Sequence, residues 1–148
     1  MEERFNLFAL LISRINKSIK KIKSKEAERL NLKTVHVTCL YNLYKKKYLT
    51  SKELAVLCDE DKSSISRTLE YLENAGYVMQ DKQSVGKYKN HFLLTRSGRK
   101  IANRLAEKID NALSDAGVGL SDSAKSVIYD GLGVVSSNLN EICKEMNK

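Results

Sequence analysis

Apolar residues recur at helical spacing along most of the chain. Near the N-terminus they alternate at intervals of three and four residues, the spacing of a helix that packs along another helix. This seam consists of Phe5, Phe8, Ile12, Ile15, Ile19 and Ile22. A second amphipathic stretch begins at Thr34 and carries Val35, Val37, Leu40, Leu43 and Tyr44.

Two more amphipathic helices are predicted after residue 95. Thr95 can cap the first, whose apolar residues are Ile101, Leu105, Ile109 and Leu113. Residues 114–123 interrupt the pattern, and Ser121 can cap the last helix. That helix places on one side Ala124, Ile128, Leu132, Val135, Leu139, Ile142 and Met146. Gly131 and Gly133 cost it about 1 kcal/mol each relative to alanine, so a kink is possible there.

Residues 49–76 read as two short helices joined by a tight turn. Thr50 and Glu53 have the spacing of a capping box and open the first helix. Its apolar face is formed by Leu54, Ala55, Leu57 and Cys58. Asp61 is the candidate N-cap of the second helix, 62–75, and Gly76 ends it. The core stripe of this second helix is Ile65, Leu69 and Leu72.

A β-hairpin is predicted directly after these helices. Residues 77–81 and 91–95 are β-prone, and the long connection 82–90 contains Gly86, Lys87 and Lys89. A hairpin connection of this length tends to be functional or mobile. A basic tip can enter a minor groove or lie along phosphates, although taken alone an ordinary charged loop is the better interpretation.

The polar residues that open the second helix suit duplex DNA. Hydroxyls bond base edges or phosphates, arginine can grip guanine through two hydrogen bonds, and lysine neutralises phosphate. These residues lie off the core stripe: Lys62, Ser63, Ser64, Ser66 and Arg67. Thr50 and Ser51, which open the preceding helix, join them as candidate DNA contacts. A solvated helix face with ordinary caps is the alternative for any one serine, but the order helix, turn, helix and hairpin favours a winged helix-turn-helix.

Four segments carry a resemblance to a known family. They are Leu49–Ala55, Asp61–Arg67, Leu72–Val78 and Leu94–Gly98, which contain Leu-Thr-x-x-Glu-Leu-Ala, Asp-Lys-Ser-Ser-x-Ser-Arg, Leu-Glu-x-x-Gly-Tyr-Val and Leu-Thr-x-x-Gly. In this order and spacing they resemble the MarR family of bacterial and archaeal transcription regulators. The match covers the central third of the chain strongly, and the flanking helices match in pattern only.

The resemblance implies a fold and a set of partners. The expected fold is mainly α with a small β-hairpin wing (α+β), in one domain spanning residues 1–148. Residues 34–96 would form the DNA-binding winged helix-turn-helix, and residues 1–33 and 97–148 the dimerisation helices of an obligate homodimer. The resemblance places Ser63, Ser64, Ser66 and Arg67 on the recognition helix and Lys87 near the wing tip. It also implies a ligand pocket between the dimerisation helices and the winged helix-turn-helix regions.

The wing departs from the family pattern at one point. Family wings often carry Asp-x-Arg or Asp-Arg-Arg where this chain has Gly86-Lys87-Tyr88. The acid that would hold a wing arginine is missing, so the minor-groove contact is the least secure part of the resemblance.

Charge is unevenly distributed along the chain. The formal net charge is +8, and residues 1–33 and 45–100 each carry an excess of five positive charges, whereas residues 114–148 carry a net charge of −2. This distribution predicts a basic DNA-facing side and a side remote from DNA. With no span-length apolar run and no signal-peptide pattern, we expect a cytoplasmic protein with no membrane partner.

The cysteines and histidines argue against other chemistries. Cys39, Cys58 and Cys143 are odd in number and widely separated, which disfavours a disulfide framework, and His36 and His91 complete no zinc pattern. We see no phosphate loop and no nucleophile–base pairing, so neither an enzyme nor a cofactor is expected. A redox-sensing role of a thiol stays open.

Two long apolar seams on terminal helices have too little domain left to cover them. In a homodimer, interleaved first and last helices would cover both seams. The alternative is that both seams pack on the chain's own winged domain. We therefore predict a homodimeric DNA-binding regulator, most simply a repressor, on a pseudo-palindromic operator. A small-molecule effector is expected, with His36, Tyr41 and Tyr44 as candidate ligand contacts, although core packing is the commoner role of such aromatic residues. A winged-helix module that docks proteins is the alternative function.

Overall fold

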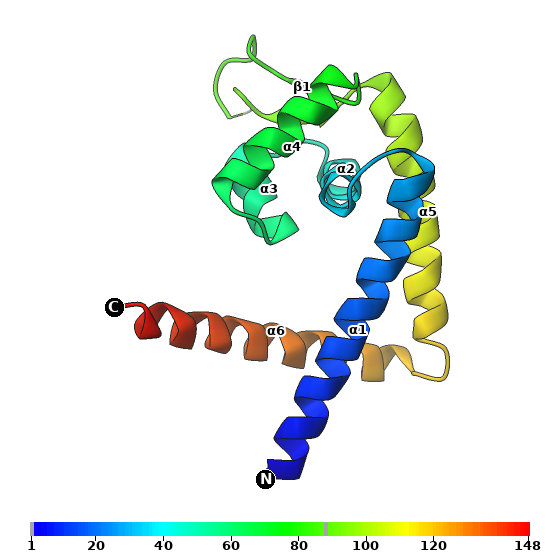
Figure 1. Cartoon of the computed structure of the whole chain (residues 1–148), viewed down its shortest axis with the longest axis vertical. Helices are drawn as coiled ribbons and strands as arrows, with labels where there is room; N and C mark the ends of the chain where they lie inside the picture. Colours follow the sequence, from blue (N-terminus) through cyan, green and yellow to red (C-terminus); the bar gives the residue numbers. More distant parts are fainter. Residues whose placement is uncertain (1, 88) are drawn as a thin grey trace. The chain divides into compact units, whose positions relative to one another are not determined.

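The computed structural model describes residues 2–87 and 89–148 of the chain (Figure 1). The chain divides into two compact units, Met1–Asp110 and Asn111–Lys148, and the fifth helix contributes residues to both. The helices and strands are α1 (Glu2–Arg29), α2 (Thr34–Lys46), α3 (Ser51–Cys58), α4 (Lys62–Asn74), β1 (Val78–Gln80), β2 (Phe92–Leu94), α5 (Arg96–Ala116) and α6 (Asp122–Met146).

Helices α3 and α4 begin where the sequence predicts them. The Thr50 side chain accepts a hydrogen bond from the Glu53 amide at 3.1 Å, and the Glu53 carboxylate accepts one from the Thr50 amide at 2.8 Å, which confirms the capping box. Asp61 caps α4 by accepting from the Ser64 amide at 2.7 Å. Each bond satisfies an amide that the first turn of a helix leaves unpaired, so short polar side chains fix both helix starts.

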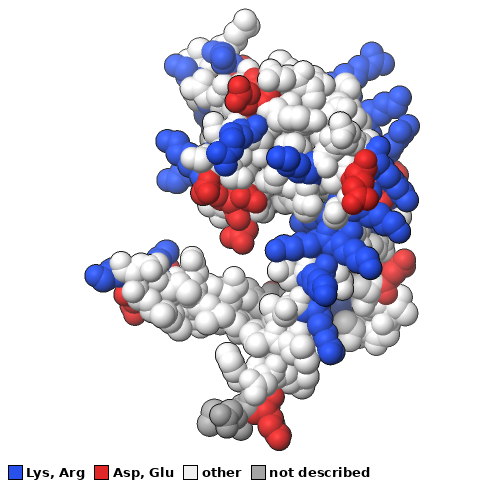
Figure 2. All heavy atoms as spheres, viewed as in Figure 1, with Lys and Arg blue, Asp and Glu red and all other residues white. Residues whose placement is uncertain are grey.

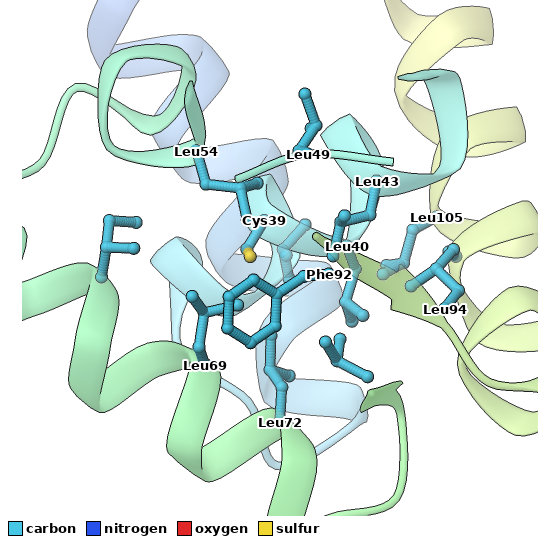
Figure 3. Packing of buried hydrophobic residues seen from close by; sticks show 14 of the residues in the cluster. Cys39, Leu40, Leu43, Leu49, Leu54, Leu69, Leu72, Phe92, Leu94 and Leu105 are labelled. Carbon is cyan, nitrogen blue, oxygen red and sulfur yellow. The ribbon is translucent and has the colours of Figure 1, made fainter. Parts of the chain in front are cut away.

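One hydrophobic core holds α2, α3, α4 and the hairpin together (Figure 3). Ile65, Leu69 and Leu72 of α4 are buried in it, as their spacing predicts. The end of α1 and the first half of α5 also join it, through Ala27 and Leu105, so the core extends beyond residues 34–96. Leu57 differs from the prediction: its side chain is 42% exposed, and in α3 only Leu54 is fully buried.

The wing strands are shorter than the sequence predicts. β1 and β2 pair antiparallel over three residues each, with Val78 opposite Leu94 and Gln80 opposite Phe92. Leu49 forms an additional bridge to Phe92 that the sequence pattern does not indicate. Phe92 therefore connects the segment before α3 to the hairpin.

Helix α5 starts against the backbone of the residue that precedes β1. The Thr95 hydroxyl accepts from the Gly98 amide at 3.0 Å and donates to the Gly76 carbonyl at 2.6 Å. A Cβ atom on Gly98 would lie 1.8 Å from the Tyr77 carbonyl oxygen, so no larger residue fits without movement of the backbone. The Thr-x-x-Gly segment thereby fixes the start of α5 on the hairpin.

Both terminal helices carry uncovered apolar side chains. In α1 these include Phe5, Phe8, Ile12 and Ile15, which are 37–68% exposed. α6, taken by itself, has no buried residue and exposes Ile128, Tyr129, Val135, Leu139, Ile142 and Met146. Ser121 caps α6 as predicted, and the helix continues through Gly131 and Gly133. No helix in the described ranges is long and apolar enough to cross a lipid bilayer.

Candidate nucleic-acid interface

The first two turns of α4 present one polar face to solvent. Lys62, Ser63, Ser66 and Arg67 line a shallow concavity of about 530 Å³ on the surface. All four residues are exposed, whereas Ile65 and Thr68 on the opposite face are buried. Ser64 is half-buried at the edge of this face, and its amide is held by Asp61. We call Lys62, Ser63, Ser66 and Arg67 the α4 face.

The two cations of the α4 face have no partner among the described residues. Neither Lys62 nor Arg67 forms an ion pair or a side-chain hydrogen bond with any residue in the described part of the chain. An unpaired guanidinium keeps all five donors for an outside partner, and two hydroxyls stand beside it. The face can therefore bind phosphate or read the acceptor edge of a base.

Two further candidate DNA contacts are Thr50, which caps α3, and Ser51, the first residue of α3. The Thr50 hydroxyl is occupied by the capping box, and these hydrogen bonds from Thr50 hold the pKa of the Glu53 carboxyl below its usual value. Ser51 is half-buried at the first helical position. Their role as DNA contacts remains a prediction.

A turn organised by Asp81 supports the tip of the hairpin. The Asp81 carboxylate accepts from the amides of Gln83 and Ser84 at 3.1 and 2.9 Å and from the Ser84 hydroxyl, and these bonds lower the pKa of the Asp81 carboxyl. Gly86 has a φ of +88°, a value that favours glycine.

The predicted wing lysines lie beyond this turn. Lys87 and Lys89 are exposed, and Val85 is 95% exposed beside them. Tyr88, the last residue of the Gly86-Lys87-Tyr88 departure, lies outside the described residues. Sequence reasoning did not single out Val85, because one apolar residue in a polar loop carries no periodic signal.

The three candidate ligand residues of α2 each have a partner within the chain. His36 is buried, stacks on Tyr71 with ring centroids 4.4 Å apart, and accepts the Lys33 amide at Nδ1. The Tyr41 hydroxyl donates to Asp110 at 2.8 Å, and the Tyr44 hydroxyl donates to Asn103 at 2.5 Å. The two tyrosines thus connect α2 to α5, while His36 contacts α4.

Two cysteines that are far apart in sequence lie together. Cys39 is buried, and its side chain is hydrogen-bonded to that of Cys58, which is half-exposed at the end of α3. The Cys39 hydrogen bond and the nearby Lys23 ammonium lower the pKa of Cys58, whereas the same bond and burial raise the pKa of Cys39. The sequence pattern placed Cys58 on an apolar face but gave no sign that it would meet Cys39. Among the described residues no group of three or more His, Cys, Asp or Glu side chains could hold a metal ion.

Solved structures with the same arrangement of helices and wing identify the fold. No protein-family model and no curated protein sequence matches the chain. A transcriptional regulator of the MarR family from Silicibacter pomeroyi superposes with a TM-score of 0.75 at 23% identity, covering 86% of each chain. This is the fold of the MarR-family transcription regulators.

Two further MarR-fold comparisons cover a similar share of the chain. A putative MarR family transcriptional regulator from Listeria monocytogenes, solved in complex with a 26mer DNA, has a TM-score of 0.76 at 18% identity over 88% of this chain and 87% of that one. NadR in complex with 4-hydroxyphenylacetate has a TM-score of 0.74 at 18% identity over 85% and 89%. In the MarR fold of the present chain, α3 and α4 form the helix-turn-helix and β1–β2 the wing.

Proposed function

We propose that this protein is a DNA-binding transcription regulator of the MarR family, and that α4 reads the major groove of duplex DNA. One observation carries the proposal: on a MarR fold, Lys62 and Arg67 of the α4 face have no partner in the described part of the chain and stand beside two exposed serine hydroxyls. Arg67 reads a base, and Lys62 neutralises a phosphate. The Listeria protein of the same fold, solved with DNA, supports this assignment.

The wing makes a second, sequence-independent contact in this proposal. Lys87 and Lys89 are exposed at the end of a ribbon held by the Asp81 turn. Two lysines near phosphates release counterions and add about one unit each to the salt dependence of binding. Without the family's acid–arginine pair, the wing lies along the backbone rather than reading bases.

The functional unit in our proposal is a homodimer. Exposed apolar side chains run along α1 and α6, and isolated helices with such faces need a covering surface. Residues 1–33 and 97–148 of two copies supply it. A two-fold dimer presents two α4 faces to half-sites one helical turn apart, so the operator is pseudo-palindromic. A dimer that covers a promoter in this way represses by exclusion.

A small-molecule effector acts on the connection between α2 and α5 in this proposal. Tyr41 and Tyr44 make the two hydroxyl contacts between these helices, and His36 links α2 to Tyr71 of α4. A ligand that competes for these groups changes the position of α4 and lowers DNA affinity by its preference for that altered state. NadR, which has the same fold, was solved with an aromatic carboxylate bound.

Selection of duplexes from a random pool tests the proposed function. We expect enrichment of a sequence with two inverted half-sites about ten base pairs apart, bound at least about a thousandfold more tightly than random duplex at physiological salt. If no sequence is enriched and binding to any duplex is weak and sequence-blind, the proposal fails, and the winged helix is a protein-docking module.

Thiol-based redox sensing is a second candidate, favoured by the contact between Cys39 and Cys58. A hydroperoxide would accept the Cys58 thiolate's electron pair and leave as water or alcohol, forming a sulfenic acid. Attack by the Cys39 sulfur would then form the disulfide with loss of water. Release of bound DNA by peroxide in the native chain, but not in the Cys58→Ser variant, would support this candidate, and equal sensitivity of both would exclude it.

A further inference from the structure

A basic cavity separates the middle of α1 from the helix-turn-helix. Its volume is about 830 Å³, and its walls come from α1, the first turns of α2 and the end of α3. Lysines dominate the α1 wall, and two threonine hydroxyls of α2 stand beside them: Lys17, Lys20, Lys21, Lys23, Thr34 and Thr38. Figure 2 shows Lys and Arg side chains gathered over the middle of α1.

The lysines of this cavity are not held in ion pairs within the described part of the chain. None of the four lysines forms an ion pair with a residue in the ranges that the structure describes. Two carboxylates, Asp59 and Glu60, also line the cavity, yet neither forms an ion pair with a lysine among the described residues. The cavity therefore keeps an excess of two positive charges.

Gathering these lysines on one helix is unfavourable without an anion. Lys17 and Lys21 stand four residues apart, where like charges destabilise a helix. Lys23 is half-buried, and burial lowers the pKa of its ammonium group. A multiply charged anion bound among the ammonium groups would offset both the repulsion and the desolvation cost through charge-assisted hydrogen bonds.

We propose that this cavity binds a small molecule that carries two or more phosphate or carboxylate groups. Four lysines can neutralise several anionic oxygens at once, and the Thr34 hydroxyl can donate to another, whereas the Thr38 hydroxyl already donates to the Thr34 carbonyl. A ligand with one carboxylate on an aromatic ring would leave most of these cations without a partner. The site is separate from Tyr41 and Tyr44, which are not among the residues that line it.

The cavity borders the turn that precedes α4 and its polar face. Asp59 and Glu60 belong to the turn between α3 and α4, and the next residue, Asp61, caps α4. A ligand held by α1 and touching this turn links the terminal helix to the start of the recognition helix. The regulatory role of the site, though not the binding itself, rests on the proposed function. Any coupling is reciprocal, so DNA would change ligand affinity by the same factor.

Calorimetric titration of the full-length chain tests the site directly. The probes are tripolyphosphate, citrate and inorganic phosphate. We expect saturable binding of tripolyphosphate or citrate, at least about tenfold tighter than the binding of inorganic phosphate. Tighter binding of tripolyphosphate would indicate a phosphate ligand, and tighter binding of citrate a carboxylate ligand. Binding that does not saturate, or equal affinity for inorganic phosphate, would overturn the proposal.

Matched lysine variants locate the binding. Lys20→Ala combined with Lys23→Ala should weaken the tighter probe on the order of tenfold or more. The control, Lys46→Ala with Lys47→Ala, removes the same charge from exposed lysines outside the cavity and should change affinity less than about twofold. Equal losses in both variants would mean diffuse attraction and no site. Lys17→Gln with Lys20→Gln, which leaves half-buried Lys23 in place, provides the same comparison if the first variant does not fold.

Measurements of duplex binding show whether the cavity lysines bind a small anion or instead contact the phosphates of DNA. Without any ligand, the lysine variant should bind duplex with the affinity and salt dependence of the native chain. A lower salt slope would show that these lysines contact DNA and would overturn the proposal. If the native chain binds no duplex at all, the proposed function fails while the calorimetric result stands unaffected.

Discussion

Single polar side chains fix where α3, α4 and α6 begin. Thr50, Asp61 and Ser121 each accept a hydrogen bond from an amide of the first turn, as the sequence predicts. The requirement is local, because a short side chain reaches only the amides two or three residues ahead. Sequence reasoning succeeds at such positions. It does not reveal that Cys39 meets Cys58 or that Tyr41 reaches Asp110, since those contacts depend on the packing of separate helices.

His36 makes the free energy of unfolding of the chain depend on pH. Burial and the Lys33 charge lower the pKa of the imidazole below its usual value, and the neutral ring accepts the Lys33 amide. The unfolded chain therefore takes up a proton near pH 6.5 while the folded chain does not, so the free energy of unfolding should fall as the pH drops below about 6.5.

Urea denaturation at fixed protein concentration measures this effect. Between pH 7.5 and 5.5 the midpoint of the native chain should fall more than that of His36→Phe, which keeps a ring against Tyr71 but cannot be protonated. Parallel decreases in the two proteins would show that His36 does not titrate differently on folding.

At the scale of elements, periodicity predicts every helix, while tertiary contacts set the ends of the strands. The two β-prone runs form strands of three residues each, and single backbone hydrogen bonds from Asp81 to His91 and from Thr95 to Tyr77 continue the pairing at either end before the Asp81 turn and α5 begin. Leu57 fits the apolar pattern of α3, yet it remains exposed beside the basic cavity. An eight-residue helix buries one narrow stripe, and its rotation about its own axis is decided by the helices it meets.

The contact between Gly98 and the Tyr77 backbone yields a test at this scale. Gly98→Ala should destabilise the chain by about 1–3 kcal/mol or more, because the added methyl group must displace α5 from the hairpin. Gly133→Ala is the matched control: its Cβ meets no atom, and replacing a helical glycine should stabilise by up to about 1 kcal/mol. Thermal unfolding measures the stability of both variants. An unchanged unfolding temperature for Gly98→Ala would mean that α5 does not pack against the hairpin as described.

For the whole molecule, the uncovered faces of α1 and α6 are the feature on which the proposed homodimer rests. Neither apolar seam finds a covering surface inside its own unit, and both were predicted from spacing alone. The sequence could not say how two copies interleave, because an apolar face specifies burial but not the orientation of the surface that covers it.

Assembly is checked by sedimentation at micromolar concentration. The native chain should sediment as a dimer, and Ile12→Asp should dissociate it, because a carboxylate would enter a buried seam. Ser13→Asp, which adds the same charge off the seam, should leave the dimer intact. A monomeric native chain would contradict the proposed assembly, and equal dissociation by both variants would contradict the assignment of the seam.

Whether the α4 face reads base sequence is measured by the affinity of Arg67→Ala for two duplexes. One duplex carries the selected sequence and the other a scrambled version, measured at the same physiological salt. We expect the variant to lose about 1–3 kcal/mol on the selected duplex and far less on the scrambled one, since a base contact is lost only where the right base stands. Equal losses on both duplexes would make Arg67 a phosphate contact and would contradict the claim that this face confers specificity.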